Sequence, residues 1–186
     1  RGSSSCSPAA PPSRCLREGS GIASALEIES ASAEATEALG ERIGAACRGG
    51  ELLVLSGELG AGKTCFVRGL ARGLGCDAHA VRSPSFTLLF SYGGRITLRH
   101  FDAYFTTSAI DLERAGLAEA LAAGEVAAIE WGERFAKELP TDRLEIELTH
   151  VAPERRRLRP SARGPRGEAL LETREFRAHR RLVAQP

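Results

Sequence analysis

The chain has 186 residues, 42% of them hydrophobic and 26% charged, an ordinary balance for one globular domain and too little chain for two comfortable ones. Its 25 basic and 24 acidic side chains leave a net charge of +1, which excludes a general attraction to nucleic acid, and no run approaches the roughly 18 apolar residues of a membrane span. The five cysteines, odd in number and without the close pairing of a zinc or redox site, favour a reducing compartment, so we expect a cytoplasmic protein with no membrane contact.

The two ends of the chain differ from its middle. The first residues are rich in Ser, Pro and Ala and lack the apolar segment of a secretory signal. We predict a disordered extension over residues 1–21, with a transit-peptide remnant as the alternative, and a flexible tail over residues 179–186. The folded domain is then expected to cover residues 22–178. The chain begins at Arg1 and contains no methionine, so its true N-terminus is unknown.

A strand, a helix and a second strand are predicted first. Ordered structure is expected to begin near Ile22, with apolar and acidic residues alternating up to Glu29 as in a half-exposed strand. From Ser32, a suitable cap, the spacing of apolar residues becomes helical, and Gly49–Gly50 ends that helix. The continuous apolar run Leu52–Leu55 predicts a strand that is buried on both faces.

A glycine-rich loop follows the buried strand directly. Gly57, Gly62, Lys63 and Thr64 stand at a spacing in which backbone N–H groups surround a phosphate, the lysine reaches the β and γ phosphates and the threonine hydroxyl binds Mg²⁺. A helix predicted over residues 63–74 points the positive end of its dipole at the same anion. The sequence therefore predicts an ATP site with contacts from Leu59, Gly60, Ala61, Gly62, Lys63, Thr64 and Cys65.

Two further features near this loop have a functional and a structural interpretation. A helix N-terminus lowers the pKa of a reactive thiol, but Cys65 is expected to be packed and inert. Ser83, Ser85 and Thr87 surround a proline and either sense the γ-phosphate as a switch segment or form a plain turn before a strand. We include Ser85 among the predicted cofactor contacts.

The middle of the chain predicts a hairpin, a helix and a buried strand. The segments 86–92 and 95–101 flank Gly93–Gly94, which indicates a β-hairpin with a tight turn. Residues 108–123 have helical periodicity, and Val126–Ile129 is a short apolar strand.

Acidic residues follow two of these strands. Catalysis at a phosphate loop requires a carboxylate for Mg²⁺ and an acceptor for the attacking water. Glu130 is the first choice for the metal, together with Thr64, and Asp102 is the second. The predicted catalytic residues are Lys63, Asp102 and Glu130. We expect structural roles for their neighbours, with His100 part of its strand and Trp131 packed near the nucleotide.

The C-terminal part predicts a helical turn over residues 134–139, a strand over 144–148, a return strand over 155–159 and a helix over 168–176. Pro160 argues that the return strand lies at a sheet edge. We interpret its arginines as a solvated face rather than an RNA-binding patch. The whole pattern predicts an α/β fold: a single P-loop NTPase domain with a mixed, mostly parallel sheet, antiparallel hairpins and flanking helices.

Four motifs together resemble the TsaE (YjeE) family of bacterial ATPases. They are Gly57–Thr64, Ser83–Thr87, His100–Tyr104 and Glu130–Trp131, and their order and spacing also fit. The likeness begins near Leu26, covers most of the chain, and is far more specific than a phosphate loop alone.

The resemblance implies a role in forming threonylcarbamoyladenosine beside the anticodon of tRNAs that read ANN codons. Family members look like ATPase accessories that dock on the TsaB–TsaD heterodimer and support its repeated turnover, with weak hydrolysis alone and tRNA contact through the complex. At the matching positions, Thr64 and Glu130 would bind Mg²⁺, and Asp102 would assist hydrolysis or couple nucleotide state to docking. Three positions depart from the usual pattern, namely Cys65, Ser85 and Phe105; Phe105 replaces an arginine and makes the coupling the least secure inference.

Two other functions fit parts of the pattern. A small-molecule kinase also places a phosphate loop in an α/β domain of this size, but it needs a lid with arginines between core strands. The arginines here cluster after Val151 instead. A nucleotide-dependent binding module that hydrolyses ATP too slowly to matter is barely distinguishable by sequence.

Overall fold

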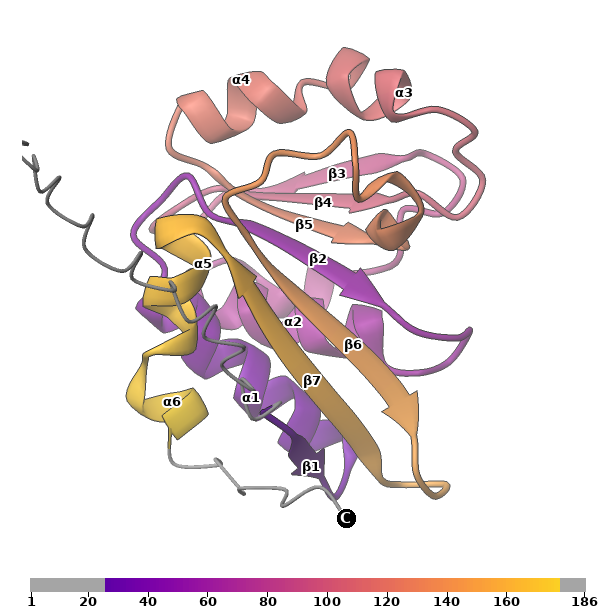
Figure 1. Ribbon diagram of the computed structural model, residues 1–186, viewed down its shortest axis with the longest axis vertical. Coiled ribbons are helices and arrows are strands. Elements are labelled where there is room, and N and C mark those ends of the chain that lie inside the picture. Colours follow the sequence, from indigo (N-terminus) through magenta and orange to yellow (C-terminus); the bar gives the residue numbers. More distant parts are fainter. Residues whose placement is uncertain (1–25, 178–186) are drawn as a thin grey trace, which may run out of the picture.

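The computed structural model describes residues 26–177, so the predictions for residues 1–21 and 179–186 lie outside the described residues. One mixed sheet has the strand order β1-β7-β6-β2-β5-β4-β3, with helices on both faces (Figure 1). The strands are β1 (Ile28–Ser30), β2 (Leu52–Ser56), β3 (Leu89–Tyr92), β4 (Leu98–Asp102), β5 (Val126–Glu130), β6 (Arg143–His150) and β7 (Arg156–Arg163). The helices are α1 (Ala33–Ala46), α2 (Lys63–Gly73), α3 (Ala109–Arg114), α4 (Leu117–Ala122), α5 (Gly164–Leu171) and α6 (Arg174–Arg177), with helical turns η1 (Ala78–Ala80) and η2 (Gly132–Phe135). The predicted α/β class is confirmed.

Parallel pairing at the centre of the sheet positions the predicted site. Strand β2 pairs in parallel with β5 on one side and β6 on the other, and β5 pairs in parallel with β4. Carboxyl ends of parallel strands meet at one edge, where ligands bind in open α/β sheets. The register places Glu130 opposite both Leu55 and Asp102. The two acids thereby lie beside the loop that leaves β2.

Two hydrophobic cores explain why β2 is apolar at every position. Its residues Leu53 and Leu55 face the core beneath α1, α2 and α5, whereas Leu52 and Val54 face the core beneath α3, α4 and η2. All four side chains are at most 2% exposed. A strand covered by helices on both faces has no polar side, which confirms the prediction from its continuous apolar run. None of the helices within residues 26–177 has the length and apolar character that a membrane span requires.

Helices α1 and α2 approach each other through glycines. Ser32 caps α1 as predicted, because its hydroxyl accepts from the Ala35 N–H. A Cβ added at Gly69 of α2 would lie 1.9 Å from the carbonyl oxygen of Glu37, and one added at Gly40 of α1 would lie 2.2 Å from that of Phe66. The close contact fixes α2, which begins at the phosphate loop, against α1.

Three local predictions are wrong. The helix expected over residues 168–176 is two elements, because α5 begins earlier, at Gly164, and ends at Leu171, and α6 begins at Arg174. The helix expected over residues 108–123 is broken into α3 and α4 at Gly116, which has a φ of +88°. Strand β7 is not an edge strand, because it pairs with β6 on one side and β1 on the other. The short strand β1 reaches only Arg156–Leu158, so Pro160, which has no N–H to donate, lies beyond that pairing.

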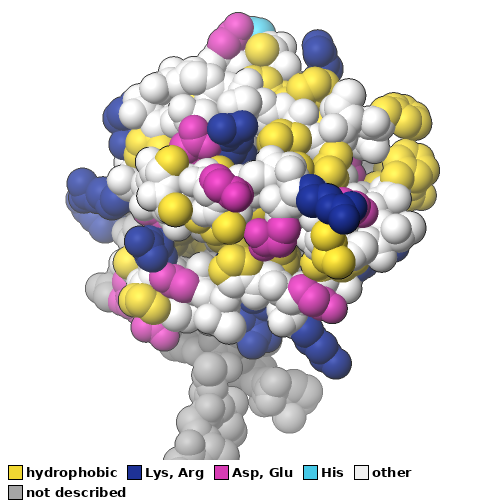
Figure 2. Space-filling model, turned by 90° about the horizontal axis from the view of Figure 1, so that it is seen from above, with side chains coloured by type: hydrophobic (Ala, Val, Ile, Leu, Met, Phe, Trp, Pro, Cys, Tyr) yellow, Lys and Arg dark blue, Asp and Glu magenta, His cyan; other side chains and the backbone are white. Residues whose placement is uncertain are grey.

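Charged side chains on the surface are mixed in sign. The face over α3 and α4 carries basic and acidic side chains interspersed with apolar ones (Figure 2). On β7, Arg157 and Arg159 pair with the carboxylate of Glu27 across the sheet, and Arg163 pairs with Glu145. This pairing agrees with the interpretation of the arginine run as a solvated face.

Candidate nucleotide-binding site

The loop between β2 and α2 has the backbone of an anion site. Gly57 has a φ of +128°, and a Cβ there would lie 2.1 Å from the Leu148 carbonyl oxygen, so only glycine lets the loop lie against β6. Gly62 has a φ of +106° and stands at the N-cap of α2, where no side chain caps the helix. The first N–H groups of α2 therefore need another acceptor, and an anion supplies it.

Lys63 is held inside this loop. Its side chain is buried, and its Nζ donates to the carbonyl oxygens of Gly57 at 2.6 Å and Glu58 at 2.9 Å. The same Nζ lies 3.6 Å from the ring centroid of Trp131, close enough for a cation–π interaction. Burial lowers the pKa of Lys63, and the nearby carboxylates, Glu130 foremost, oppose that shift. The loop thus presents a buried ammonium whose position is fixed by two carbonyl groups and an aromatic ring.

Glu130 is the centre of a buried hydrogen-bonded group. Its Oε1 lies 2.7 Å from the hydroxyl of Thr64 and 2.9 Å from Nε2 of His100. An ionised carboxylate can only accept, so the Thr64 hydroxyl donates to it, and His100 donates to it in the tautomer that carries its proton on Nε2. The ring is fully buried, and its Nδ1 has no partner within the described part of the chain. His100 therefore orients Glu130 rather than merely filling the core.

Asp102 ties the predicted switch segment to β4. Its Oδ2 accepts from the hydroxyls of Ser83 and Ser85, each at 2.6 Å, and its Oδ1 accepts from the Tyr104 N–H at 2.9 Å. Thr87 instead donates to the Pro84 carbonyl oxygen within its own turn. The two serines lie at the site, whereas Thr87 belongs to the turn.

A cavity of about 460 Å³ joins the loop to both acids. The predicted cofactor contacts lie on its wall except Ala61, whose side chain is fully buried and whose N–H donates to the Glu58 carbonyl oxygen. Four of its lining residues, Phe86, Tyr104, Phe105 and Trp131, form an aromatic wall. The lining residues are Leu59, Gly60, Gly62, Lys63, Thr64, Cys65, Ser83, Ser85, Phe86, Asp102, Tyr104, Phe105, Glu130 and Trp131.

Sequence reasoning placed Trp131 near the nucleotide but missed the other three residues of the aromatic wall, Phe86, Tyr104 and Phe105. Phe86 is 93% exposed and stacks on Phe105 with ring centroids 5.5 Å apart, and Tyr104 contacts both Phe105 and Trp131. Trp131 has a φ of +63°, an unusual conformation for a bulky residue and one that is found at functional sites. A signal was present in the sequence, since each of these residues lies within three positions of a predicted switch or acidic residue.

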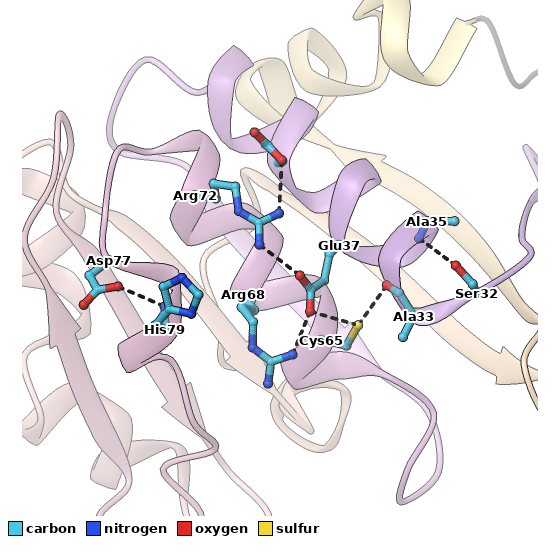
Figure 3. A network of polar contacts seen from close by, with 10 residues as sticks. Ser32, Ala33, Ala35, Glu37, Cys65, Arg68, Arg72, Asp77 and His79 are labelled. Atoms are coloured by element: carbon cyan, nitrogen blue, oxygen red, sulfur yellow. Dashed lines mark hydrogen bonds and ion pairs between the residues drawn. The ribbon is translucent and has the colours of Figure 1, made fainter.

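The position of Cys65 decides between its two interpretations. Its Sγ donates to the Ala33 carbonyl oxygen at 3.2 Å and lies near Glu37, which is itself paired with Arg68 and Arg72 (Figure 3). Burial, followed by the charge of Glu37, raises the pKa of the Cys65 thiol. A thiol with a lowered pKa is therefore wrong, and the packed, inert thiol is the better description.

The residues around Thr64 fit a magnesium nucleotide better than a metal held by protein alone. Within residues 26–177 no group of three or more His, Cys, Asp or Glu side chains could hold a metal ion. Mg²⁺ is commonly bound by one or two protein oxygens together with substrate phosphates and water. The Thr64 hydroxyl and the Glu130 carboxylate supply such oxygens at the open end of the loop.

The buried parallel strand, the glycine loop and the uncapped helix define a protein with the P-loop nucleotide-binding fold. A family model described as threonylcarbamoyl adenosine biosynthesis protein TsaE matches residues 30–158. The chain belongs to the TsaE family, as its four motifs predicted.

Relatives and a solved structure agree with this assignment. The chain is 44% identical to a tRNA threonylcarbamoyladenosine biosynthesis protein TsaE of Treponema pallidum over 68% of this chain and 93% of that protein. It is 34% identical to the TsaE protein of Bacillus subtilis over 79% of this chain and 92% of that protein. The crystal structure of Bacillus subtilis YdiB superposes on this chain with a TM-score of 0.66 and 31% sequence identity. The match covers 83% of this chain and 95% of YdiB. The family places the protein in tRNA threonylcarbamoyladenosine biosynthesis.

Proposed function

We propose that this protein binds MgATP and hydrolyses it to support threonylcarbamoyladenosine formation on tRNA. The observation that carries the proposal is the contact between Thr64 of the phosphate loop and Glu130 at the end of β5, beside buried Lys63. That arrangement provides a phosphate-binding cation, a hydroxyl and a carboxylate in one cavity.

Each side chain then has a separate task. The N–H groups that begin α2 bind phosphate oxygens, and Lys63 exchanges its carbonyl partners for the β and γ phosphates. Thr64 and Glu130 would hold Mg²⁺, which when bound neutralises charge on the phosphates. Asp102 accepts from Ser83 and Ser85, so a nucleotide that draws Ser85 away changes how the switch segment is held.

The partners follow from the family and its chemistry. We propose that residues 22–178 act as one cytoplasmic ATPase domain that docks on TsaB–TsaD, with tRNA reached through that complex. The exposed pair Phe86 and Phe105 adjoins the nucleotide cavity and the Asp102-bound segment. Exposed aromatic groups are enriched where proteins meet. Nucleotide state and partner docking are thereby linked through one segment.

Replacing Glu130 by glutamine tests the hydrolytic part of this proposal. Glu130→Gln keeps the size of the side chain and removes its charge, so we expect MgATP binding to remain while kcat falls about 10²- to 10³-fold. Phosphate release and nucleotide affinity measured on the same samples separate the two effects. Glu138→Gln, the same change at an exposed residue, should match the native protein. Native turnover in Glu130→Gln would refute the role of this carboxylate.

His100 should influence the metal without touching the nucleotide. In His100→Leu the Glu130 carboxylate keeps only Thr64 as a side-chain donor, so we expect a 10- to 100-fold loss of turnover, roughly, and a higher Mg²⁺ requirement. His100→Gln supplies another N–H donor and should recover part of the loss. Titrating Mg²⁺ at fixed ATP measures both effects, with His79→Leu at an exposed histidine as the control. An unchanged Mg²⁺ requirement in His100→Leu would show that His100 is only structural.

A further inference from the structure

One arginine of β7 differs from the others in its surroundings. Arg157, Arg159 and Arg163 each lie within 4 Å of a carboxylate on a neighbouring strand. Arg156 has no carboxylate partner among residues 26–177, and its hydrogen bonds there go to carbonyl groups. Its charge is therefore not neutralised locally.

The sheet brings this unpaired cation to the phosphate loop. On the face of β7 that packs against α1 and α2, Leu158 is fully buried in the core. Arg156 precedes it by two residues and therefore lies on the same face of the strand. Arg156 stands opposite His150 in the β6–β7 register. A Cβ added at Gly62, the N-cap of α2, would lie 3.9 Å from Nε of Arg156. The core-facing side of β7 thus begins with the guanidinium of Arg156, which lies beside the start of α2.

One terminal nitrogen of the Arg156 guanidinium is held by hydrogen bonds, and the other is available to a ligand. Nη1 donates to the carbonyl oxygens of Ala152, Pro153 and Arg155 in the β6–β7 turn, at 3.2, 2.9 and 3.1 Å. No hydrogen bond within the described residues uses its Nη2. The side chain is therefore anchored without having its donors exhausted, and it presents a directed N–H fork to an anion.

The strand order separates Arg156 from the proposed metal site. Strands β6 and β7 lie on one side of β2, and β5 and β4, which end in Glu130 and Asp102, lie on the other. The positive charge of Arg156 also reaches Cys65, in the first turn of α2, where it opposes a small part of the rise that burial causes in the pKa of that thiol. Lys63 serves the β and γ phosphates, whereas the N–H groups of this turn reach the α and β phosphates. Arg156 therefore lies beside the first turn of α2, on the opposite side of β2 from Glu130 and Asp102.

We propose that Arg156 is a further nucleotide contact that binds the α-phosphate of ATP and ADP. The inference rests on the proposed function, because it requires a nucleotide in the P-loop. It assigns the β6–β7 turn, which none of the four motifs includes, to the nucleotide site. ATP and ADP both carry an α-phosphate, so the contact strengthens their binding equally and leaves the preference between them unchanged.

Affinity measurements with MgATP and MgADP on the full chain test this contact. Arg156→Gln should weaken both nucleotides by the same factor, about tenfold or more, because a hydrogen bond to a charged group is lost. Arg155→Gln removes the same charge from the neighbouring exposed residue and should stay within about twofold of native. Equal affinities in Arg156→Gln and Arg155→Gln would overturn the inference, as would a loss confined to ATP. A native chain that binds neither nucleotide would overturn the proposed function as well.

A salt series separates phosphate binding from damage to the turn. If Arg156→Gln melts at a lower temperature than the native chain, both are compared where both are folded. An electrostatic contact gives a difference in affinity that shrinks as salt rises from about 50 mM to about 500 mM, because the shorter Debye length screens it. A difference that is independent of salt would overturn the contact and leave Arg156 a structural residue of the turn.

Discussion

Lys63→Ala should abolish useful ATP turnover, with kcat falling about 10²- to 10³-fold and nucleotide affinity falling about tenfold or more. The ammonium is buried, faces the carbonyl oxygens of Gly57 and Glu58, and lies over the ring of Trp131. These contacts hold the ammonium in the loop before nucleotide arrives. Steady-state phosphate release and equilibrium binding of MgATP measure the two losses.

The composition of the chain supplies a matched control for this change. Lys63 and Lys137 are its two lysines. Lys137 is exposed after η2, so Lys137→Ala should turn over ATP at the native rate. Lys63→Arg should also fail, because a planar fork replaces a compact ammonium in a filled space. Native affinity and turnover in Lys63→Ala would mean that nucleotide does not bind in this loop.

Gly69→Ala should be strongly destabilising, lowering the free energy of unfolding by about 2–3 kcal/mol, net of the better helix propensity of alanine. The new Cβ would lie 1.9 Å from the carbonyl oxygen of Glu37 and 2.7 Å from its carbonyl carbon. These are backbone atoms of α1, so the two helices must move apart. A loss of this size in a chain of this length lowers Tm by roughly 4–12 °C, which a thermal melt resolves.

Gly93→Ala is the corresponding control, because a Cβ at Gly93 has nothing within 4 Å and its φ is not in the left-handed region. We expect its Tm within about 2 °C of native. A Gly69→Ala protein as stable as Gly93→Ala would show that α1 and α2 can separate without cost. Nucleotide affinity should fall along with stability in Gly69→Ala, since α2 begins with Lys63 and Thr64.

The centre of the site could be predicted because local sequence determines it. The spacing from Gly57 to Thr64 fixes a loop, and an apolar strand that ends in Glu130 must run beside β2 to be buried on both faces. Asp102 and Glu130 meet because both end parallel strands in register. At these positions the sequence pattern alone is enough to predict where the side chains lie.

The surroundings of the site depend on contacts between distant segments, and these could not be predicted. His100 lies two residues before Asp102 on a strand, which shows a shared face but not that Nε2 reaches Glu130. The break between α3 and α4 depends on one glycine, Gly116, in an otherwise helical pattern. The approach of Arg156 to the loop requires the β6–β7 pairing. Long-range packing decides all three.

Threonylcarbamoyladenosine formation by the TsaB–TsaD transferase, followed over many turnovers with tRNA, MgATP and this chain added or withheld, tests the central claim most directly. We expect one or few turnovers without the chain, continued product formation with it, and loss of that support in Lys63→Ala and Glu130→Gln but not in Lys137→Ala. We also expect the partners to stimulate ATP hydrolysis. Equal product formation with native chain and Glu130→Gln, or hydrolysis that the partners never stimulate, would contradict this claim and favour a nucleotide-dependent binding module.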